Sequence, residues 1–369
     1  MNYILFDPPS SLIQKSYPFT LTRPFGELRI FGGTIKEFWE TVLGVKISYL
    51  TRPHLSKLYP PTKWSKKNML IPASAWPLYR VLPNGSRDYF FWHVVINNPV
   101  SLKEVQDMYD NDLRRMSQGH TEDILVNGFQ SLFTSLLSST FPEWQKKTGV
   151  FKMDCSKNLL LNDDDGPILV EDDVTIMEGA MIRGPVHICK GSTIKMGAKI
   201  YGPTVIGPYC KIGGEVSSCI FLGYSNKAHE GFLGHSIIGE WCNIGAGTSN
   251  SNLKNDYGTV KMWDYSSKRF EDSQEQFLGL YMGDHSKCAI NTSFNTGTTV
   301  GVNSNIFGSG FPRNFIPSFS WGGAQGVKDY NFKKAISVAE KVMARRGVKL
   351  TDSYVSMLRA VRDITYAMK

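Results

Sequence analysis

The sequence has no C-x-x-C pair among its six cysteines, and no apolar run approaches the roughly 18 residues that a membrane-spanning helix requires. The histidines His187, His229 and His285 also lack a recognisable metal-ligand spacing. The opening segment MNYILFDPPSS lacks a basic stretch followed by a long apolar one. We therefore expect a cytoplasmic protein with reduced, buried thiols, no membrane span and no bound metal in the repeat region.

No dense basic cluster resembles a nucleic-acid-binding surface, although the formal net charge is +8. Lysines and arginines are spread along the chain and are densest from Lys328 to Lys369. A spread positive charge suits phosphorylated small molecules such as nucleotide sugars or coenzyme A. The content of 41% hydrophobic and 20% charged residues is typical of a globular chain, and 369 residues suffice for two or three domains. We expect no nucleic-acid partner.

A branched aliphatic residue returns at every sixth position between Val170 and Ile212, and a small residue follows each one four positions later. A six-residue period does not keep one face of an α-helix apolar, and the recurring glycines and prolines would interrupt one long strand. A parallel β-helix, in which each hexapeptide is a short strand and a bend, satisfies both constraints. The aliphatic positions are Val170, Ile176, Ile182, Ile188, Ile194, Ile200, Ile206 and Ile212.

The repeat shifts its phase by two residues after Ile212 and again before Met282. Between the two shifts it resumes at Ile238 and Ile244. A phase shift in a regular repeat is typical of an inserted loop, so we expect loops to leave the β-helix over residues 218–237 and 250–281. Loops on a rigid scaffold often carry binding and catalytic residues, and we expect the chemistry there.

The segment before the repeat, residues 1–150, is predicted to be an α/β domain with strands at Tyr3–Phe6 and His93–Ile96 and helices at Leu28–Leu43 and Leu102–Met116. Ser101 and Glu104 have the spacing of a capping box at the start of the last helix.

Residues 324–369 predict two helices, because the pattern from Tyr330 to Arg346 stops at Gly347 and Thr351 precedes a second apolar stripe. We expect the two helices to pack on the β-helix. Contact of Arg345 or Arg346 with a coenzyme is the alternative.

The most specific motif is Lys227-Ala-His229-Glu-Gly-Phe-Leu-Gly234, followed by Asn243-Ile-Gly-Ala246-Gly and then Asn252. It resembles the acetyltransferase half of the bacterial bifunctional enzyme that makes UDP-N-acetylglucosamine. The strings IMEGAMIRGP, KMGAKIYG, MGDHSKCAINTSFNTGT and LTRPFGELRI are similar to a variant bacterial family related to that enzyme, which has a divergent, shortened nucleotidyltransferase-like head. The resemblance runs through nearly the whole chain.

This resemblance implies a divergent nucleotidyltransferase-like α/β head over residues 1–150, a left-handed parallel β-helix over 151–323 and a C-terminal helical segment over 324–369. It also implies a homotrimer with each active site between neighbouring β-helices. The implied reaction is acetyl-CoA-dependent N-acetylation of an amino-sugar 1-phosphate, such as glucosamine 1-phosphate. The product would supply UDP-N-acetylglucosamine or a related nucleotide sugar.

The resemblance assigns His229 as the general base and Glu215 as the acidic residue that orients its ring. A sugar amine is protonated near neutral pH, and an imidazole that titrates near pH 6.5 can take up that proton. Without the motif, a lone loop histidine is more often a structural polar group. The other roles implied by the resemblance are sugar-site contacts from Asn243 and Asn252, a backbone contact to the coenzyme from Ala246, and a phosphate contact from Lys227.

Two positions depart from the pattern of the bifunctional enzyme. Ser217 stands where that enzyme has a sugar-phosphate-binding lysine, and Phe232 stands at the position of a tyrosine in the acceptor pocket. A cation and a hydroxyl are therefore missing, so the acetyl-transfer residues are kept while the identity of the acceptor sugar stays open.

The head lacks the Gly-rich phosphate loop that usually follows the first strand of sugar nucleotidyltransferases, because its segment reads Phe6-Asp-Pro-Pro-Ser-Ser. Arg23, Arg29 and Lys36 are candidate substitutes as phosphate-binding cations, and Asp7 or Asp88 is a candidate ligand of Mg²⁺. A head that transfers a nucleotidyl group from UTP or another NTP and a head that has lost this activity both stay open.

The sequence thus predicts an N-acetyltransferase, with nucleotidyl transfer by the head as a second activity. Two alternatives remain at this point. One is an enzyme with nucleotidyltransferase activity alone, and the other is a non-catalytic protein that binds sugar nucleotides or acts as a scaffold.

Overall fold

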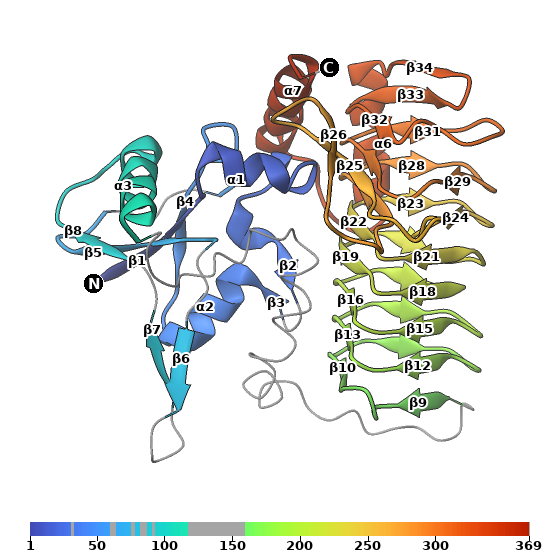
Figure 1. The fold of residues 1–369 in the computed structure, drawn as a ribbon, viewed down its shortest axis with the longest axis horizontal. Helices are drawn as coiled ribbons and strands as arrows, with labels where there is room; N and C mark the ends of the chain where they lie inside the picture. Colours follow the sequence, from blue (N-terminus) through green and yellow to red (C-terminus); the bar gives the residue numbers. More distant parts are fainter. Residues whose placement is uncertain are drawn as a thin grey trace.

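A computed structural model describes residues 1–30, 33–59, 64–74, 78–81, 87–90, 93–116 and 159–368. In Figure 1 the α/β head lies beside a long stack of β-strand coils, and the last helix lies between the two near one end of the stack. This order of elements confirms the predicted α/β head, parallel β-helix and C-terminal helices. The predicted domain boundary near residue 150 lies outside the described residues.

The head is built on a four-stranded sheet in the order β4-β1-β5-β8. The first three strands are parallel, and β8 is antiparallel to β5. The predicted strands at the start of the chain and at residues 93–96 are confirmed. The elements of the head are β1 (Asn2–Phe6), α1 (Ser10–Lys15), β2 (Arg29–Ile30), β3 (Gly33–Thr34), α2 (Ile35–Leu43), β4 (Ser48–Leu50), β5 (Asn68–Pro72), β6 (Leu78–Val81), β7 (Arg87–Phe90), β8 (Val94–Ile96) and α3 (Leu102–Met116), with short 3-10 turns at Phe19–Leu21 and Phe25–Glu27.

The starts of two helices of the head were predicted from the sequence. The helix at Leu102–Met116 has the predicted capping box, in which the Glu104 amide donates to the Ser101 hydroxyl and the Ser101 amide donates to the Glu104 carboxylate. The predicted start of the other helix at Leu28 is wrong, because α2 begins at Ile35. Residues 29–30 instead pair with residues 33–34 in a short antiparallel ladder, and Thr34 then caps α2.

The β-helix has three faces, each built mainly of parallel strands, and the strands of successive coils pair with one another (Figure 1). The eight-stranded face contains β10 (Ile168–Val170), β13 (Val186–Ile188), β16 (Thr204–Ile206), β19 (Ile220–Gly223), β22 (Ile237–Glu240), β27 (Leu280–Met282), β30 (Thr298–Val300) and β32 (Phe315–Ile316). The nine-stranded face contains β11 (Thr175–Ile176), β14 (Thr193–Ile194), β17 (Lys211–Ile212), β20 (Asn226–Lys227), β23 (Asn243–Ile244), β28 (Lys287–Cys288), β31 (Asn305–Ile306), β33 (Ser320–Gly323) and the antiparallel β34 (Gly326–Asp329). The third face contains β9 (Leu160–Asn162), β12 (Met181–Arg183), β15 (Lys199–Tyr201), β18 (Glu215–Ser217) and β21 (Phe232–Gly234), and after them the pair β24 (Ser249–Asn250) and β29 (Ser293–Phe294).

The aliphatic residues of the repeat stack inward as predicted, with Ile176 level with Ile194 and Ile194 level with Ile212. Their side chains are buried in one continuous core. Each coil therefore adds apolar area to its neighbours, which is the main favourable free energy of such a stack. Five cysteines, Cys189, Cys210, Cys219, Cys242 and Cys288, are buried and free, which confirms the prediction of reduced thiols for the described residues.

The two phase shifts have different structural causes. The loop predicted over residues 218–237 is wrong, because this segment forms a regular coil with β19, β20 and β21. That coil is shorter, since 15 residues separate Ile212 from the level position Lys227, whereas 18 separate Ile194 from Ile212. The loop predicted over residues 250–281 is confirmed. It leaves the β-helix and forms the antiparallel hairpin of β25 (Lys261–Asp264) and β26 (Arg269–Asp272).

The C-terminal helices are α6 (Phe332–Ala344) and α7 (Asp352–Tyr366), and Asn331 and Thr351 cap them through their side chains. Met357, Leu358 and Val361 of α7 are buried in a core cluster that also contains residues of the head and of the β-helix. The predicted packing of these helices on the β-helix is confirmed. None of the described helices is both long and apolar enough to cross a membrane.

Candidate active site

His229 lies at the corner where each coil passes from the nine-stranded face to the third face, between β20 and β21. Its side chain is exposed. We call the residues at the same place in successive coils the corner series, and the strand register gives them as Glu178, Met196, Gly214, His229, Ala246, Ile290 and Gly308. The neighbours of His229 in this series are a glycine and an alanine, so neither brings a large side chain to the imidazole.

Gly214 is adapted to its place beneath His229. Its φ is +68°, and a Cβ atom there would lie 2.7 Å from the carbonyl oxygen of His229 and 2.9 Å from the Cα atom of Glu230. Both the backbone conformation and the close approach therefore require glycine. The backbone of the histidine corner is thus packed directly against the coil below it.

Lys227 points into the β-helix, level with Ile212 in the inward ladder. Its ammonium group donates hydrogen bonds to the carbonyl oxygens of His229 at 2.7 Å and of Gly213 at 3.1 Å. Burial lowers its pKa to about 8, an effect that the charge of Glu230 partly offsets. This inward position contradicts the phosphate contact predicted for Lys227, because a buried ammonium held by two carbonyls does not reach a ligand outside the coil.

Glu215 begins β18 on the third face, one coil below Phe232 in the strand register. Its carboxylate accepts a 2.7 Å hydrogen bond from the hydroxyl of Tyr201. The predicted pairing of Glu215 with the ring of His229 is not among the hydrogen bonds of the described residues, so its orienting role stays a prediction. Sequence reasoning missed Tyr201, which no part of the motif indicates.

Phe232 and Asn252 both come close to Gly234, since a Cβ atom on this glycine would lie 2.5 Å from Phe232 Cζ and 2.7 Å from Asn252 Nδ2. The Asn252 amide also hydrogen-bonds Nδ1 of His235 at 2.8 Å, and the ring of His235 stacks on Phe277. Burial lowers the pKa of His235, which keeps this ring neutral. The structure therefore adds to this pair His235, which the sequence suggested only as a structural polar group, and Phe277, which sequence reasoning missed.

Two other predicted site residues lie near His229 but on different parts of the coil. Ala246 is its upper neighbour in the corner series, and its carbonyl accepts the amide of Asn291 at 2.7 Å. Asn243 is exposed on the nine-stranded face, one coil above Asn226. Arg346 reaches the same face, where its guanidinium donates a 2.9 Å hydrogen bond to Asn226. The structure thus places Asn243 apart from Phe232 and Asn252, across the corner.

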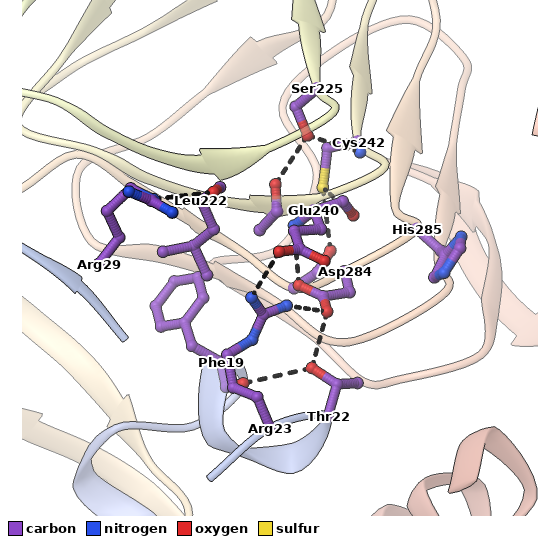
Figure 2. Close-up of polar contacts among 12 residues, drawn as sticks. Phe19, Thr22, Arg23, Arg29, Leu222, Ser225, Glu240, Cys242, Asp284 and His285 are labelled. Atoms are coloured by element: carbon purple, nitrogen blue, oxygen red, sulfur yellow. Dashed lines mark hydrogen bonds and ion pairs between the residues drawn. The ribbon is translucent and has the colours of Figure 1, made fainter. Parts of the chain in front are cut away.

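Arg23 of the head is buried against the β-helix and does not face an open phosphate site (Figure 2). Its guanidinium pairs with the carboxylate of Asp284 and, at 3.0 Å, with that of Glu240. Burial opposes its charge, but these two carboxylates raise the pKa of Arg23. The predicted phosphate contact is contradicted, because both acidic partners come from the β-helix and already neutralise the cation.

Arg29 and Lys36 are likewise engaged elsewhere. Arg29 donates to the carbonyl of Leu222 at 3.3 Å, as Figure 2 shows, and to Sγ of Cys189 at 3.6 Å. Lys36 lies 3.9 Å from the Glu40 carboxylate and above the ring of Tyr49. Each of the three predicted phosphate-binding cations is therefore engaged by groups of the protein itself.

The candidate magnesium ligand Asp7 is buried and bonded within the head. Its carboxylate accepts hydrogen bonds from the Phe25 amide at 2.8 Å, the Thr51 hydroxyl at 2.5 Å and the Arg52 guanidinium at 3.1 Å. Because these three donors already satisfy the carboxylate, Asp7 does not fit the role of a metal ligand. The side chain of Asp88 lies outside the described part of the chain.

One group in the described residues has the donor set of a metal site, namely Glu171, His187 and Cys189. Nε2 of His187 lies 2.8 Å from the Glu171 carboxylate and 3.8 Å from Sγ of Cys189. Burial opposes its charge, yet Cys189 and Glu171 raise the pKa of His187 to about 9, while the pKa of Glu171 falls to about 2. As it stands, the trio is an ion-paired cluster, and Arg29 contacts it through Sγ of Cys189.

Parts of the chain are similar to known proteins. The family described as sugar nucleotidyl transferase matches residues 3–84. The bifunctional protein GlmU of Methanocaldococcus jannaschii is 40% identical over 89 residues, which cover 24% of this chain and 21% of that protein. The bifunctional sugar-1-phosphate nucleotidylyltransferase/acetyltransferase of Sulfurisphaera tokodaii is 33% identical over 144 residues, covering 38% and 35% of the two chains.

The matched part spans about a third or less of the length of these curated relatives. Among solved structures, the polysialic-acid-specific acetyltransferase NeuO superposes with a TM-score of 0.29 at 15% identity, over 50% of this chain and 93% of that one. The curated relatives and the matched head show that the chain is a distant and partial relative of the bifunctional sugar-1-phosphate nucleotidylyltransferase/acetyltransferases.

Proposed function

We propose that this protein N-acetylates an amino-sugar 1-phosphate with acetyl-CoA, and that His229 is the general base. The observation that carries the proposal is the exposed imidazole in the corner series, between Gly214 and Ala246, on the coil that precedes the Asn-Ile-Gly-Ala-Gly segment. Its two neighbours in the corner series bring no large side chain to the ring, and the acceptor and the thioester are proposed to bind beside it. The bifunctional relatives support the same reaction class.

In this reaction the imidazole of His229 takes a proton from the sugar ammonium, or from the amine as it attacks. The amine nitrogen forms a bond to the thioester carbonyl carbon, and the resulting oxyanion is met by backbone N–H groups of the glycine-rich turns. Collapse of the tetrahedral intermediate breaks the carbon–sulfur bond and expels coenzyme A as a thiolate. The thiolate takes up a proton, and no covalent enzyme intermediate forms.

The acceptor side of the pocket is proposed to include Phe232 and Asn252, which lie together beyond the histidine corner. Asn243 contacts the sugar in this proposal, and Ala246 contacts the coenzyme through its backbone. Glu215 orients His229 if the ring turns toward β18 when substrates bind. Because Ser217 and Phe232 bring no cation and no hydroxyl, recognition of the sugar phosphate requires residues outside this set.

The active unit is proposed to be a homotrimer whose sites lie between neighbouring β-helices. Large apolar side chains are exposed in the same corner series as His229, with Met196 exposed to 67% and Ile290 to 68%. Exposed apolar residues on either side of His229 along one edge favour contact with another protein surface. A second copy at this edge would cover them and close the groove beside the histidine.

Nucleotidyl transfer from UTP or another NTP, with Mg²⁺, is the second candidate function. The match of residues 3–84 to sugar nucleotidyl transferases favours it. The engaged positions of Arg23, Arg29 and Asp7 weigh against it, so the proposed role of the head is structural unless turnover is found. The protein is proposed to act in the cytoplasm, where both coenzyme A and nucleotide sugars are available.

A substrate panel tests these functions against each other. The purified protein is incubated with acetyl-CoA and glucosamine 1-phosphate, and release of the free thiol is followed. A parallel reaction with UTP, Mg²⁺ and N-acetylglucosamine 1-phosphate is followed by release of pyrophosphate. Thiol release that depends on the amino sugar supports acetyl transfer, pyrophosphate release alone selects the second function, and neither product leaves a binding or scaffolding protein.

A further inference from the structure

One coil of the β-helix carries an amine where the others carry apolar side chains. Along the nine-stranded face, the strand register gives the inward residues of successive coils as Ile176, Ile194, Ile212, Lys227, Ile244, Cys288 and Ile306. Lys227 is 1% exposed, so it belongs to the interior as fully as the isoleucines do. The coil that departs from the apolar rule is the coil that carries His229.

Placing an ammonium in an apolar interior is costly unless its donors are satisfied. An isoleucine or methionine would fill the same space without that cost, as the neighbouring coils demonstrate. The hydrogen bonds of Lys227 instead join two successive corners, because Nζ donates to the carbonyls of Gly213 and His229. The Lys227 carbonyl also accepts the amide of Gly213 at 2.7 Å.

These contacts fix the peptide plane that follows His229 Cα. The carbonyl of His229 is held from inside by Lys227 Nζ at 2.7 Å, while the imidazole of the same residue is exposed outside. From above, the amide of Gly247 donates to the carbonyl of Glu230 at 2.9 Å. Since the direction of the Cα–Cβ bond follows from the backbone, a contact that holds this carbonyl also helps to hold the Cβ atom from which the ring of His229 projects.

We infer that Lys227 is a positioning residue for His229, which acts from the interior of the coil by holding the His229 carbonyl. This inference rests on the proposed acetyl transfer for its kinetic consequence, although the backbone effect is independent of it. A general base loses much of its effect when it moves by about 1 Å, because the reacting atoms no longer align. Lys227 therefore contributes to turnover without touching a substrate.

The test compares three variants of the full-length protein. Lys227→Met removes the donor and keeps a similar shape, Lys227→Gln keeps a shorter, neutral donor, and Ile194→Met creates the same side chain in the same ladder two coils away. For each variant, kcat and KM are measured with acetyl-CoA and glucosamine 1-phosphate. Hydrogen exchange of peptides covering residues 209–232 is measured alongside the thermal midpoint.

We expect Lys227→Met to lower kcat by roughly 10- to 100-fold with little change in either KM. We also expect faster amide exchange within residues 209–232 and unchanged exchange in coils farther away. The glutamine variant should lie between methionine and wild type, and Ile194→Met should keep wild-type kcat. A Lys227→Met protein with the kcat and the exchange of Ile194→Met overturns the inference.

The two proposals can fail separately. If wild type shows no acetyl transfer, faster exchange confined to the histidine corner still upholds the positioning role, and unchanged exchange rejects it. If wild type is active, equal kcat in all three variants rejects the positioning role and leaves the function standing. If Lys227→Met does not fold, the same criteria apply to Lys227→Gln.

Discussion

The hydroxyl of Thr22 in the head donates a 2.7 Å hydrogen bond to the carboxylate of Asp284 in the β-helix. Arg23 pairs with the same carboxylate, and both sides of this contact are buried (Figure 2). Around it, apolar residues of the head, of the β-helix and of α7 form one core cluster. The head is therefore part of the folded core of the described molecule, and we expect it to unfold together with the β-helix.

Replacement of Asp284 tests this interface. In Asp284→Asn the buried guanidinium of Arg23 keeps only the half-buried Glu240 as a charged partner. Breaking a buried ion pair on one side costs about 3–5 kcal/mol of the free energy of unfolding. Denaturant unfolding followed by tryptophan fluorescence measures the change, and Lys103→Gln, which removes an exposed ion pair in the head, serves as control. A loss below about 1 kcal/mol would show that the interface is not a stabilising contact.

The His187 and Glu171 pair predicts a pH dependence of stability. The pKa of His187 is raised to about 9 in the folded protein, so its contribution is complete below its ordinary value near 6.5 and is lost as the pH rises through 9. The pKa of Glu171 is lowered to about 2, so its contribution is present above about 4.5 and is lost as the pH falls through 2.

The free energy of unfolding is therefore measured from pH 5 to pH 10 for wild type and for His187→Gln. We expect the difference between them to be largest near pH 6 and to shrink as the pH rises toward 10. A difference that stays constant between pH 6.5 and 9 would mean that His187 is neutral, and the trio with Cys189 would then have to be reconsidered as a metal site.

Gly214 gives a prediction about the histidine corner. In Gly214→Ala the new Cβ would meet the carbonyl of His229 at 2.7 Å, in addition to the cost of a positive φ. Gly197 has a similar φ of +64° but no atom within 4 Å of such a Cβ, so Gly197→Ala is the matched control. The control should lose about 1 kcal/mol of stability, whereas Gly214→Ala should lose more and should also lower acetyl transfer. Equal stability and equal activity in the two variants would show that the close contact at Gly214 has no effect on the histidine corner.

Much of the fold could be predicted because its determinants are local. The six-residue period predicts the inward ladders directly. Ser101 and Glu104 predict a helix start, because the contacts of a capping box join residues three positions apart. The coil over residues 218–237 was predicted wrongly as a loop because Lys227 interrupts the aliphatic pattern and the coil is short.

The contacts of the candidate site and of the head were harder to predict from the sequence. His229 could be named from its motif, but its register neighbours Gly214 and Ala246 appear only in the strand pairing. Nothing in the sequence joins Arg23 to Asp284, which lies 261 residues away. Arg23 was predicted to bind phosphate as a substitute for the missing Gly-rich loop, and the partner that neutralises it is brought by tertiary packing. For the same reason the Tyr201 partner of Glu215 has no signal in the motif.

In the proposed reaction the exposed imidazole of His229 removes a proton during acetyl transfer. The most direct test of this step is kcat/KM for glucosamine 1-phosphate with saturating acetyl-CoA in wild type, His229→Ala and Glu178→Ala, an exposed position of the same corner series. The account predicts a loss of at least about 100-fold in His229→Ala with an unchanged thermal midpoint, and wild-type turnover in Glu178→Ala. Equal turnover in wild type and His229→Ala would contradict it.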